Sequence, residues 1–127
     1  MIICEDVFRC EDIGELRDLA REFYIDNLAN TEVYNDEVGL IKFSKAGYKK
    51  PLSFSGDIRK IKLFAVLKEL VKEGKIFNRE VDRYKREKTE WLYLKTSVIL
   101  YDIKLEIIID IRKDCNGILY YDHVIYQ

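Results

Sequence analysis

The C-terminal third of the chain places the strongest constraint on its fold, because three strand-like segments follow one another with very short links. The segments read WLYLKTSVIL, IKLEIIIDIRK and ILYYDHVIY and are rich in β-branched and aromatic residues, which favour strands. Tyr101-Asp102 and Asn116-Gly117 separate them, and Asn-Gly is a strong signal for a two-residue hairpin turn. The pattern predicts an antiparallel β-meander.

Two amphipathic helices are predicted ahead of this meander. The first is EDIGELRDLAREFYIDNLAN, an acidic helix over about residues 11–30, and the second is IRKIKLFAVLKELVKEG, which ends at Gly74. Between them VGLIKFS is interpreted as a short strand, and NREVDRYKREKTE after the second helix is interpreted as a solvated charged connector. We therefore expect an α+β fold, with two helices packed on one face of an antiparallel β-meander.

The length of 127 residues suits one domain spanning 1–127, with its core region over about 38–127. The three cysteines and the single histidine do not have the spacing of a zinc site, so we expect neither a bound metal nor a cysteine-based cofactor. No apolar run approaches the roughly 20 residues that cross a bilayer, and the acidic N-terminus does not resemble a secretory signal. These features predict a cytoplasmic protein without membrane contact.

Charge is unevenly distributed along the chain, although the net charge is only −1. Residues 1–37 hold 11 acidic and 3 basic residues, whereas residues 38–75 hold 3 acidic and 10 basic residues. A basic region of this kind could attract a polyanion such as RNA. The two segments could instead pair with each other, and the sequence leaves both interpretations open.

Two-residue turns at both links would fix which residues lie opposite one another. His123 would then lie opposite Asp110, and Tyr121 would lie opposite Arg112. Opposed residues share a face, so one face of the meander would carry Trp91, Tyr93, Lys95, Glu106, Asp110, Arg112, Tyr121 and His123. The other face would carry Leu92, Leu94, Leu105, Ile107, Ile109, Ile111, Val124 and Tyr126, and it would form the core side.

The first of these faces combines aromatic and basic side chains with the only histidine. Aromatic rings stack on bases and cations hold phosphates, so this mixture is typical of a nucleic-acid-binding surface. Asp110 as a partner would favour the charged form of His123 and orient its ring, which suits general acid–base catalysis near neutral pH. The same pair would equally suit a structural role on a solvated sheet face, and the residues alone do not decide between the two.

The loop KFSKAGYKK brings Lys45, Lys49 and Lys50 close to two small residues, Ser44 and Gly47. It has neither phosphate-loop nor dinucleotide-binding spacing. Lysines on a loop before a helix can hold a phosphate and stabilise the charge that develops on it. A lysine-rich surface loop is common, so this signal has weight only together with others.

Over roughly residues 15–126, the chain resembles the large polyvalent-protein-associated domain assigned to the barnase–EndoU–colicin–RelE-like (BECR) nuclease class, which occurs in phage and mobile-element proteins. The segments that carry the resemblance are AREFYIDNLAN, GLIKFSKAGYKKPLSFSGD, IKLFAVLKELVKEGKIF, WLYLKTSVIL and LEIIIDIRKDCNGILYYDHVI. The most specific parts are FSKAGYKK and NGILYYDH. The resemblance implies a barnase/RelE-like, metal-independent RNA-cleaving fold, with helices on one face of an antiparallel sheet and the site on the other.

The resemblance also assigns individual positions. Lys49 and Lys50 fall on the basic positions after the loop glycine, and His123 falls on the histidine after the paired tyrosines. Many members of the family carry a histidine in the stretch that here reads PLSFSG, where this chain has Phe54. If that histidine is the acid or base partner in the family, this protein would either be impaired or use another group, for which Tyr93 is a candidate.

Together these observations predict a metal-independent, toxin-like endoribonuclease, in which the 2′-hydroxyl of RNA attacks the adjacent phosphorus and leaves a cyclic phosphate. The predicted catalytic residues are His123, Lys49, Lys50, Asp110 and Tyr93, and the predicted RNA-binding residues are Lys45, Lys60, Trp91, Lys95, Arg112 and Tyr121. RNA is the predicted partner, and an antitoxin or immunity protein is a further candidate. The alternatives are a catalytically degenerate module that binds RNA or protein, and an interaction domain whose acidic N-terminal helix meets a basic partner.

Overall fold

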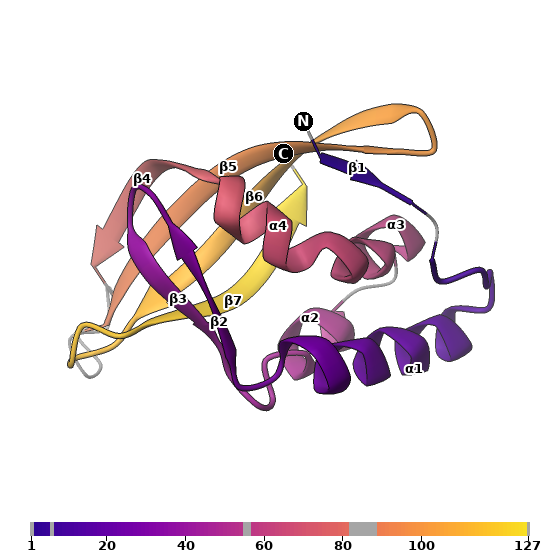
Figure 1. Cartoon of the computed structure of the whole chain (residues 1–127), viewed down its shortest axis with the longest axis horizontal. Coiled ribbons are helices and arrows are strands. Elements are labelled where there is room, and N and C mark those ends of the chain that lie inside the picture. Colours follow the sequence, from indigo (N-terminus) through magenta and orange to yellow (C-terminus); the bar gives the residue numbers. More distant parts are fainter. Residues whose placement is uncertain (1, 6, 55–56, 82–88, 127) are drawn as a thin grey trace.

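The computed structural model describes residues 2–5, 7–54, 57–81 and 89–126 of the chain (Figure 1). Its strands are β1 (Ile2–Cys4), β2 (Thr31–Asn35), β3 (Gly39–Phe43), β4 (Lys75–Val81), β5 (Glu90–Leu100), β6 (Ile103–Lys113) and β7 (Leu119–Tyr126). Its helices are α1 (Ile13–Phe23), which continues into a π-helical turn at Tyr24–Leu28, α2 (Lys49–Phe54), α3 (Ile58–Lys62) and α4 (Leu67–Glu73), with a 3₁₀ turn at Leu63–Val66 between α3 and α4.

The strands form a seven-stranded mixed sheet, and the predicted fold of two helices on an antiparallel meander is wrong. The strand order is β1-β5-β6-β7-β3-β2, and β4 pairs with the part of β5 that β1 leaves uncovered. β1 runs parallel to β5, and β3 runs parallel to β7. Because α4 contacts both β2 and β5, which are far apart in the strand order, the sheet must curl around this helix (Figure 1).

The strands that the sequence did not predict are β1, β2 and β4. All three lie at edges of the sheet, and β4 has mostly exposed side chains and overlaps the segment interpreted as a solvated connector. An edge strand with solvent on both sides lacks the apolar alternation that reveals a half-buried strand. The periodicity of the sequence therefore detected the middle of the sheet and not its borders.

The second predicted helix is divided into α3, the 3₁₀ turn and α4. Asp57 is the N-cap of α3, and its carboxylate accepts a hydrogen bond from the backbone N–H of Arg59 at 2.9 Å. Four apolar side chains spaced along this segment are nevertheless buried, and each is at most 4% exposed: Ile61, Phe64, Leu67 and Val71. Among the helices that the structure describes, none has the length and apolarity needed to cross a bilayer.

The predicted register of β5 and β6 is confirmed along its whole length. Tyr101 and Asp102 have φ angles of 53° and 62°, as a two-residue type I′ turn requires at both positions. Trp91 consequently lies opposite Arg112, and Tyr93 lies opposite Asp110. This hairpin was predictable because its turn has one favoured length.

The turn between β6 and β7 differs from the prediction. It is the loop Asp114–Ile118, in which the Asp114 carboxylate accepts hydrogen bonds from the backbone N–H groups of Asn116 and Ile118, both at 2.9 Å. This longer loop shifts the register by one residue, so Tyr121 lies opposite Ile111 rather than Arg112. A bulge at Asp122 of β7 then restores the predicted register, so that His123 lies opposite Asp110.

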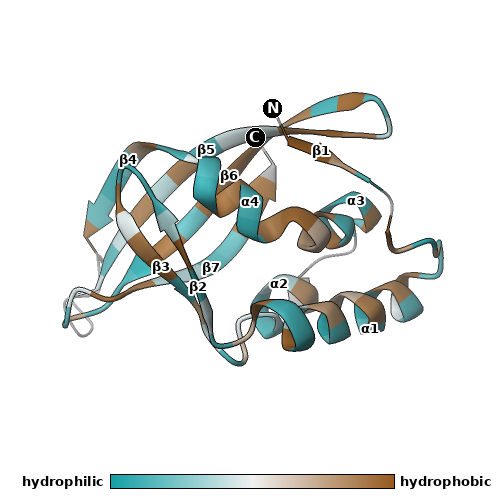
Figure 2. Cartoon of the chain, viewed as in Figure 1, coloured by the Kyte–Doolittle hydropathy of each residue, from teal (hydrophilic) through white to brown (hydrophobic). Residues whose placement is uncertain are grey.

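The core lies between the helices and the curled sheet (Figure 2). Six of the predicted core-side residues of the meander are buried, at 4% exposure or less: Leu92, Leu94, Ile107, Ile109, Ile111 and Val124. Leu105 is partly buried, and the side chain of Tyr126 lies outside the described part of the chain. Burial of each such aliphatic side chain stabilises the fold by about 1.5–3 kcal/mol.

The FSKAGYKK loop is held against α1 by the buried ring of Tyr24. The Tyr24 hydroxyl donates a hydrogen bond to the carbonyl oxygen of Ser44 at 2.7 Å, and burial raises the pKa of Tyr24 to about 12. A Cβ atom on Gly47 would lie 2.2 Å from the Tyr24 hydroxyl oxygen, so only glycine fits there. This packing fixes the position of the loop just before α2 begins at Lys49.

Candidate functional site

The candidate site lies where β3 and β7 separate. The two strands pair only through Ile41–Leu119 and Lys42–Tyr120, and further along the chain α2 contacts β7. α2 and α3 follow β3 in the chain. They bring basic residues close to the part of β7 that does not pair with β3. Lys50 of α2 and Lys60 of α3 reach it with their side chains.

The bulge in β7 places two consecutive polar residues beside these lysines. Tyr121 and Val124 are buried on the core side of the strand, whereas Asp122 and His123 between them are half-buried. In a regular strand, successive side chains alternate between the faces, so one of the two would have been directed into the core. The bulge avoids this, and His123 lies opposite Asp110 as predicted.

The side chains of Lys50, Lys60, Asp110, Asp122 and His123 form a cluster, and the two lysines contact different members of it. Lys50 Nζ donates to Asp122 Oδ2 at 2.6 Å and lies 5.6 Å from the centroid of the Trp91 ring. Lys60 Nζ lies 2.9 Å from His123 Nε2. Since an ammonium group can only donate, Nε2 is the acceptor, and the proton of the neutral imidazole belongs on Nδ1. The cluster thus joins side chains from α2, α3, β6 and β7.

The electrostatics of the cluster differ from the expectation for a histidine–aspartate pair. Burial, followed by the charges of Lys60 and Lys50, lowers the pKa of His123 to about 4. Burial, with the charge of Asp122 as the next cause, raises the pKa of Asp110 to about 6. The net shift of the His123 pKa is opposite to the one expected from a partner carboxylate, although the charge of Asp122 acts in the expected direction. At neutral pH the imidazole is therefore neutral, and a pKa of about 6 leaves Asp110 mostly ionised.

Two polar atoms of the cluster are buried and have no hydrogen-bond partner among the described residues. They are Asp110 Oδ1 and His123 Nδ1. A buried polar group without a partner costs about 1–3 kcal/mol, so natural proteins keep few of them. Such atoms concentrate at sites that bind or react with another molecule, which makes Asp110 and His123 the centre of the candidate site.

The other predicted site residues are dispersed around this centre. Tyr93 lies opposite Asp110, and its hydroxyl donates to Glu80 Oε2 at 2.9 Å. Lys45, Lys49 and Lys95 are exposed. Tyr121 is only 3% exposed, so its ring is not available to stack a base. Phe54 ends α2, and its side chain lies outside the described part of the chain.

Sequence reasoning missed Asp122 and the contact of Lys60 with His123. Asp122 is the extra residue of the bulge, and strict alternation along β7 would have placed it on the core face. Lys60 was predicted to bind RNA, whereas in the structure it contacts the imidazole of His123. A signal for the bulge in the sequence is the pair of consecutive polar residues, Asp122 and His123, which interrupts the alternation of a half-buried strand.

A second feature of the same sheet face is a row of alternating aromatic and basic residues. The registers place Trp91, Arg112, Tyr120 and Lys42 opposite one another on β5, β6, β7 and β3. The Arg112 guanidinium lies 4.9 Å from the centroid of the Tyr120 ring, within the range of a cation–π contact. Beside Tyr120 is a hollow of about 290 Å³, lined by Asn30, Thr31, Glu32, Lys42, Phe43, Ser44, Lys45 and Tyr120.

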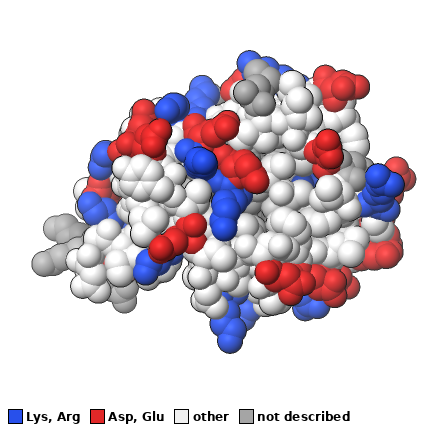
Figure 3. Space-filling model, viewed as in Figure 1, with Lys and Arg blue, Asp and Glu red and all other residues white. Residues whose placement is uncertain are grey.

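The helical side of the molecule has a different charge distribution. On the face in Figure 3, acidic side chains gather over α1, and both signs are mixed over α4. α1 contributes acidic residues such as Glu15 and Asp18, and Arg21 pairs with Asp18 at 3.9 Å. This face therefore offers no uniformly basic surface to a polyanion.

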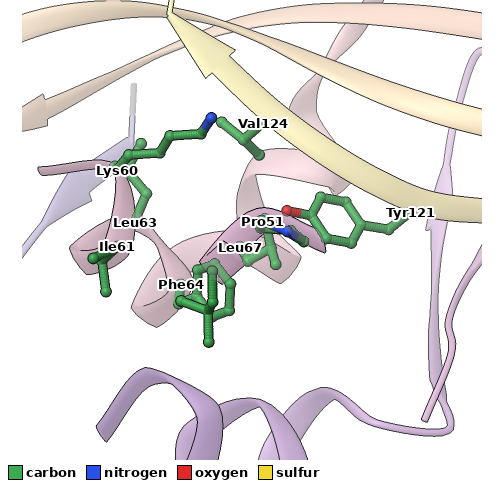
Figure 4. Close-up of a pocket in the computed structure, with 9 residues that line it drawn as sticks. Pro51, Lys60, Ile61, Leu63, Phe64, Leu67, Tyr121 and Val124 are labelled. Atoms are coloured by element: carbon green, nitrogen blue, oxygen red, sulfur yellow. The ribbon is translucent and has the colours of Figure 1, made fainter. Parts of the chain in front are cut away.

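A small cavity lies beneath β7. It has a volume of about 10 Å³ and is lined by Pro51, Leu52, Lys60, Ile61, Leu63, Phe64, Leu67, Tyr121 and Val124. The hydroxyl of Tyr121 points from β7 toward Pro51 and Leu67 (Figure 4). It is buried and has no hydrogen-bond partner among the described residues. Burial raises the pKa of Tyr121 well above its ordinary value.

Replacing Tyr121 by phenylalanine should not weaken the fold and should raise its free energy of unfolding by about 1 kcal/mol. The ring would keep its packing, and a buried polar group without a partner would be removed. Urea denaturation followed by circular dichroism would measure the change. A loss of 1 kcal/mol or more would show that the hydroxyl makes a stabilising contact.

The described residues contain no group of three or more histidine, cysteine, aspartate or glutamate side chains placed to hold a metal ion. The three cysteines lie in different places: Cys4 is buried in β1, Cys10 precedes α1, and Cys115 is exposed in the loop after β6.

A comparison with known protein families finds a match for most of the chain. The model of the family "Large polyvalent protein-associated domain 3" matches residues 11–121. No curated protein and no solved structure matches the chain significantly. The match confirms the resemblance to large polyvalent-protein-associated domains, and assignment to the BECR nuclease class is a separate question that it does not address. With most of its length covered, the chain belongs to the large polyvalent protein-associated domain 3 family.

Proposed function

We propose that the protein is a metal-independent, toxin-like endoribonuclease that acts on cytoplasmic RNA. The observation that carries the proposal is the convergence of Lys50 and Lys60 on Asp122 and His123, next to Asp110. Cleavage of RNA by its own 2′-hydroxyl needs a base, an acid and positive charge near the phosphate. All three kinds of group are present within this cluster.

Asp110 is the proposed base, because a pKa of about 6 leaves it mostly deprotonated yet still basic at neutral pH. It would take the proton of the 2′-hydroxyl while the 2′-oxygen forms a bond to phosphorus and the bond from phosphorus to the 5′-oxygen breaks. Lys60 would give its proton to the departing 5′-oxygen, since burial lowers the pKa of its ammonium group. The products would be a 2′,3′-cyclic phosphate and a 5′-hydroxyl.

His123 and Lys50 have supporting parts in this mechanism. Neutral His123 accepts from Lys60 at Nε2 and so positions that ammonium group. Lys50 would stabilise the negative charge that develops on the phosphorane, and Trp91, beside Lys50, would stack a base. In this scheme Asp122 holds Lys50 in place before RNA arrives.

A second candidate function is RNA binding without cleavage. It is favoured by the short contact between Lys50 and Asp122, in which two groups of the cluster already satisfy each other. In that case the polar face would hold RNA, and the cluster would be a structural network. The two functions differ in one observable, which is whether the RNA backbone is cut.

The test is RNA cleavage in the presence of EDTA, with chemical identification of the product ends. Wild-type protein should leave 2′,3′-cyclic phosphates and 5′-hydroxyls. Lys50→Ala should cut about 10²-fold more slowly, as for the loss of one charge-stabilising group, and His123→Ala should be at least about tenfold slower. Lys72→Ala, an exposed change on α4, is the control and should cut at the wild-type rate.

Circular dichroism of each variant would separate a loss of activity from a loss of folding. Folded wild-type protein that cuts no RNA would overturn the nuclease proposal and leave the binding function. Product ends that carry a 5′-phosphate would overturn the mechanism, because they require attack by water rather than by the 2′-hydroxyl.

A further inference from the structure

We infer that the row Trp91–Arg112–Tyr120–Lys42 is a binding track for single-stranded RNA, which ends in the hollow formed by Lys42, Lys45 and Tyr120. The inference rests on the proposed action on RNA. It adds a path that the RNA strand follows on one side of the cluster. Neither Tyr120 nor Lys42 was singled out by the sequence, because their alignment depends on the parallel pairing of β3 with β7.

The first argument is the order of side chains across four neighbouring strands. In the row, an aromatic residue on β5 is followed by a cation on β6, an aromatic residue on β7 and a cation on β3. Neighbouring strands are about 4.8 Å apart, so the row extends over roughly 14 Å. Rings that stack bases, alternating with cations that hold phosphates, are the pattern of a surface for single strands.

The second argument is the solvent exposure of the side chains in the row and the contact between two of them. Trp91, Arg112 and Tyr120 are half-buried, and Lys42 is exposed, so each presents part of its surface to solvent. The contact of Arg112 with the Tyr120 ring keeps the guanidinium in a fixed place, and a guanidinium plane can itself stack a base. A duplex does not offer its base faces, which is why the track suits an unpaired strand.

The third argument is what lies at each end of the row. At one end, Lys50 lies 5.6 Å from the Trp91 ring, which connects the row with the proposed catalytic cluster. At the other end, the hollow of about 290 Å³ carries the side chains of Lys42 and Lys45, with Glu32 as the acidic residue of its lining. Among the residues that line the hollow, the backbone N–H of Asn30 donates a hydrogen bond to the carbonyl oxygen of Phe43 at 2.9 Å.

These features place a phosphate of the bound strand in the hollow, between Lys42 and Lys45. Ser44 lines the same hollow, and its hydroxyl can donate a hydrogen bond to a phosphate oxygen, whereas the Thr31 hydroxyl already donates to the carbonyl oxygen of Leu28 at 2.6 Å. The base next to this phosphate would stack on Tyr120, and the next base along the strand would reach Arg112. The strand would then lead past Trp91 to the cluster around Asp110.

The experiment measures binding and cleavage separately. Binding is followed by the fluorescence anisotropy of a labelled single-stranded RNA with 2′-O-methyl groups, which lacks the attacking hydroxyl and is not cut. Tyr120→Leu and Lys42→Ala should each weaken binding at least about fivefold, and Lys42→Ala should lower the slope of log affinity against log salt by about one. Tyr120→Phe keeps the ring, and Lys72→Ala lies on α4, so both should bind within about twofold of wild type.

The outcomes distinguish the track from the nuclease proposal. If Tyr120→Leu and Lys42→Ala bind like wild type, the track is wrong, whether or not RNA is cut. If both weaken binding while the wild type cuts no RNA, the track stands and the nuclease proposal fails. Wild-type protein that does not bind the oligonucleotide at low salt would also overturn the track. Equal weakening on a matched RNA duplex would overturn its preference for single strands.

Discussion

Asparagine in place of Asp110 should reduce RNA cleavage by about 10²- to 10⁴-fold, which is the usual contribution of a general base. The side chain would keep its size and lose its ability to take a proton. In wild-type protein, kcat/KM should rise with pH through about pH 6, where Asp110 loses its proton. In Asp110→Asn this rise should be absent, and a residual rate that does not depend on pH in that range is expected.

The same substitution should stabilise the fold at neutral pH. The pKa of Asp110 is higher in the folded chain, at about 6, than its ordinary value of 3.8, so wild-type protein loses stability as the pH rises from about 4 through about 6. Asp110→Asn escapes that loss. Because the site is only half-buried, solvent screening reduces the gain to about 1 kcal/mol above pH 6, and it should vanish below about pH 4.

Urea denaturation at pH 4 and pH 7 would measure this gain. Asp18→Asn, on the exposed surface of α1, is the matched control and should change the free energy of unfolding by less than about 0.5 kcal/mol. Loss of activity together with a gain of stability is the combination expected of a residue kept for its chemistry. Cleavage by Asp110→Asn at the wild-type rate would exclude Asp110 as the base.

Alanine in place of Gly47 should lower the free energy of unfolding by about 1–3 kcal/mol, the usual cost of overpacking a closely packed site. The new Cβ would lie 2.2 Å from the Tyr24 hydroxyl oxygen and 3.0 Å from Tyr24 Cζ. Tyr24 cannot move aside easily, because it is fully buried and its ring packs edge-on against Phe43 and Tyr48. Cleavage should fall as well, since the loop leads directly into α2 and Lys50.

A double substitution makes this prediction specific. Tyr24→Phe removes the oxygen atom nearest to the new Cβ, so the pair Gly47→Ala and Tyr24→Phe should cost less than the sum of the two single changes. Gly14→Ala is the comparison, because the closest contact of its Cβ outside the helix backbone and its chain neighbours would be Oδ1 of the Asp12 side chain that caps α1, at 3.3 Å. Simple additivity of the two changes would show that the hydroxyl is not what Gly47 avoids.

The parts of the fold that could be predicted are those in which local chemistry decides the geometry. The register of β5 and β6 follows from a turn of one favoured length, and the core side of the meander follows from alternation along two long strands. The mixed sheet could not be predicted in this way. Its parallel pairs, β1 with β5 and β3 with β7, join segments far apart in the chain, and no short-range pattern encodes them.

The candidate site was predictable only in part. The predicted pairing of His123 with Asp110 is correct, but two irregularities that the prediction lacked, a longer loop and a bulge, cancel each other to produce it. The loop after β6 is longer than a two-residue turn, because Asp114 holds it through two backbone N–H groups. The bulge at Asp122 restores the register, so His123 still lies opposite Asp110. Tyr121, which lies between the two irregularities, is the residue that the prediction placed on the wrong face.

The direction of the pKa shifts was beyond sequence reasoning for a different reason. A histidine opposite an aspartate suggests a charged imidazole when only that pair is considered. Lys60 and Lys50 come from helices whose position depends on the separation of β3 from β7, and their charges, added to burial, outweigh the carboxylates. Tertiary structure therefore decides which group of the cluster can act as a base.

The pairing of β1 with β5 has a consequence for how the protein reaches its native state. Ile2 pairs with Val98 and Cys4 with Leu100, so the ribosome makes β1 long before its partner exists. Until β5 has been synthesised, β1 has no partner strand in the sheet, and contacts between such distant segments form slowly because a long loop must close first. The outer border of the sheet must therefore be completed late, after the hairpin of β5 and β6 has given β1 a surface on which to dock.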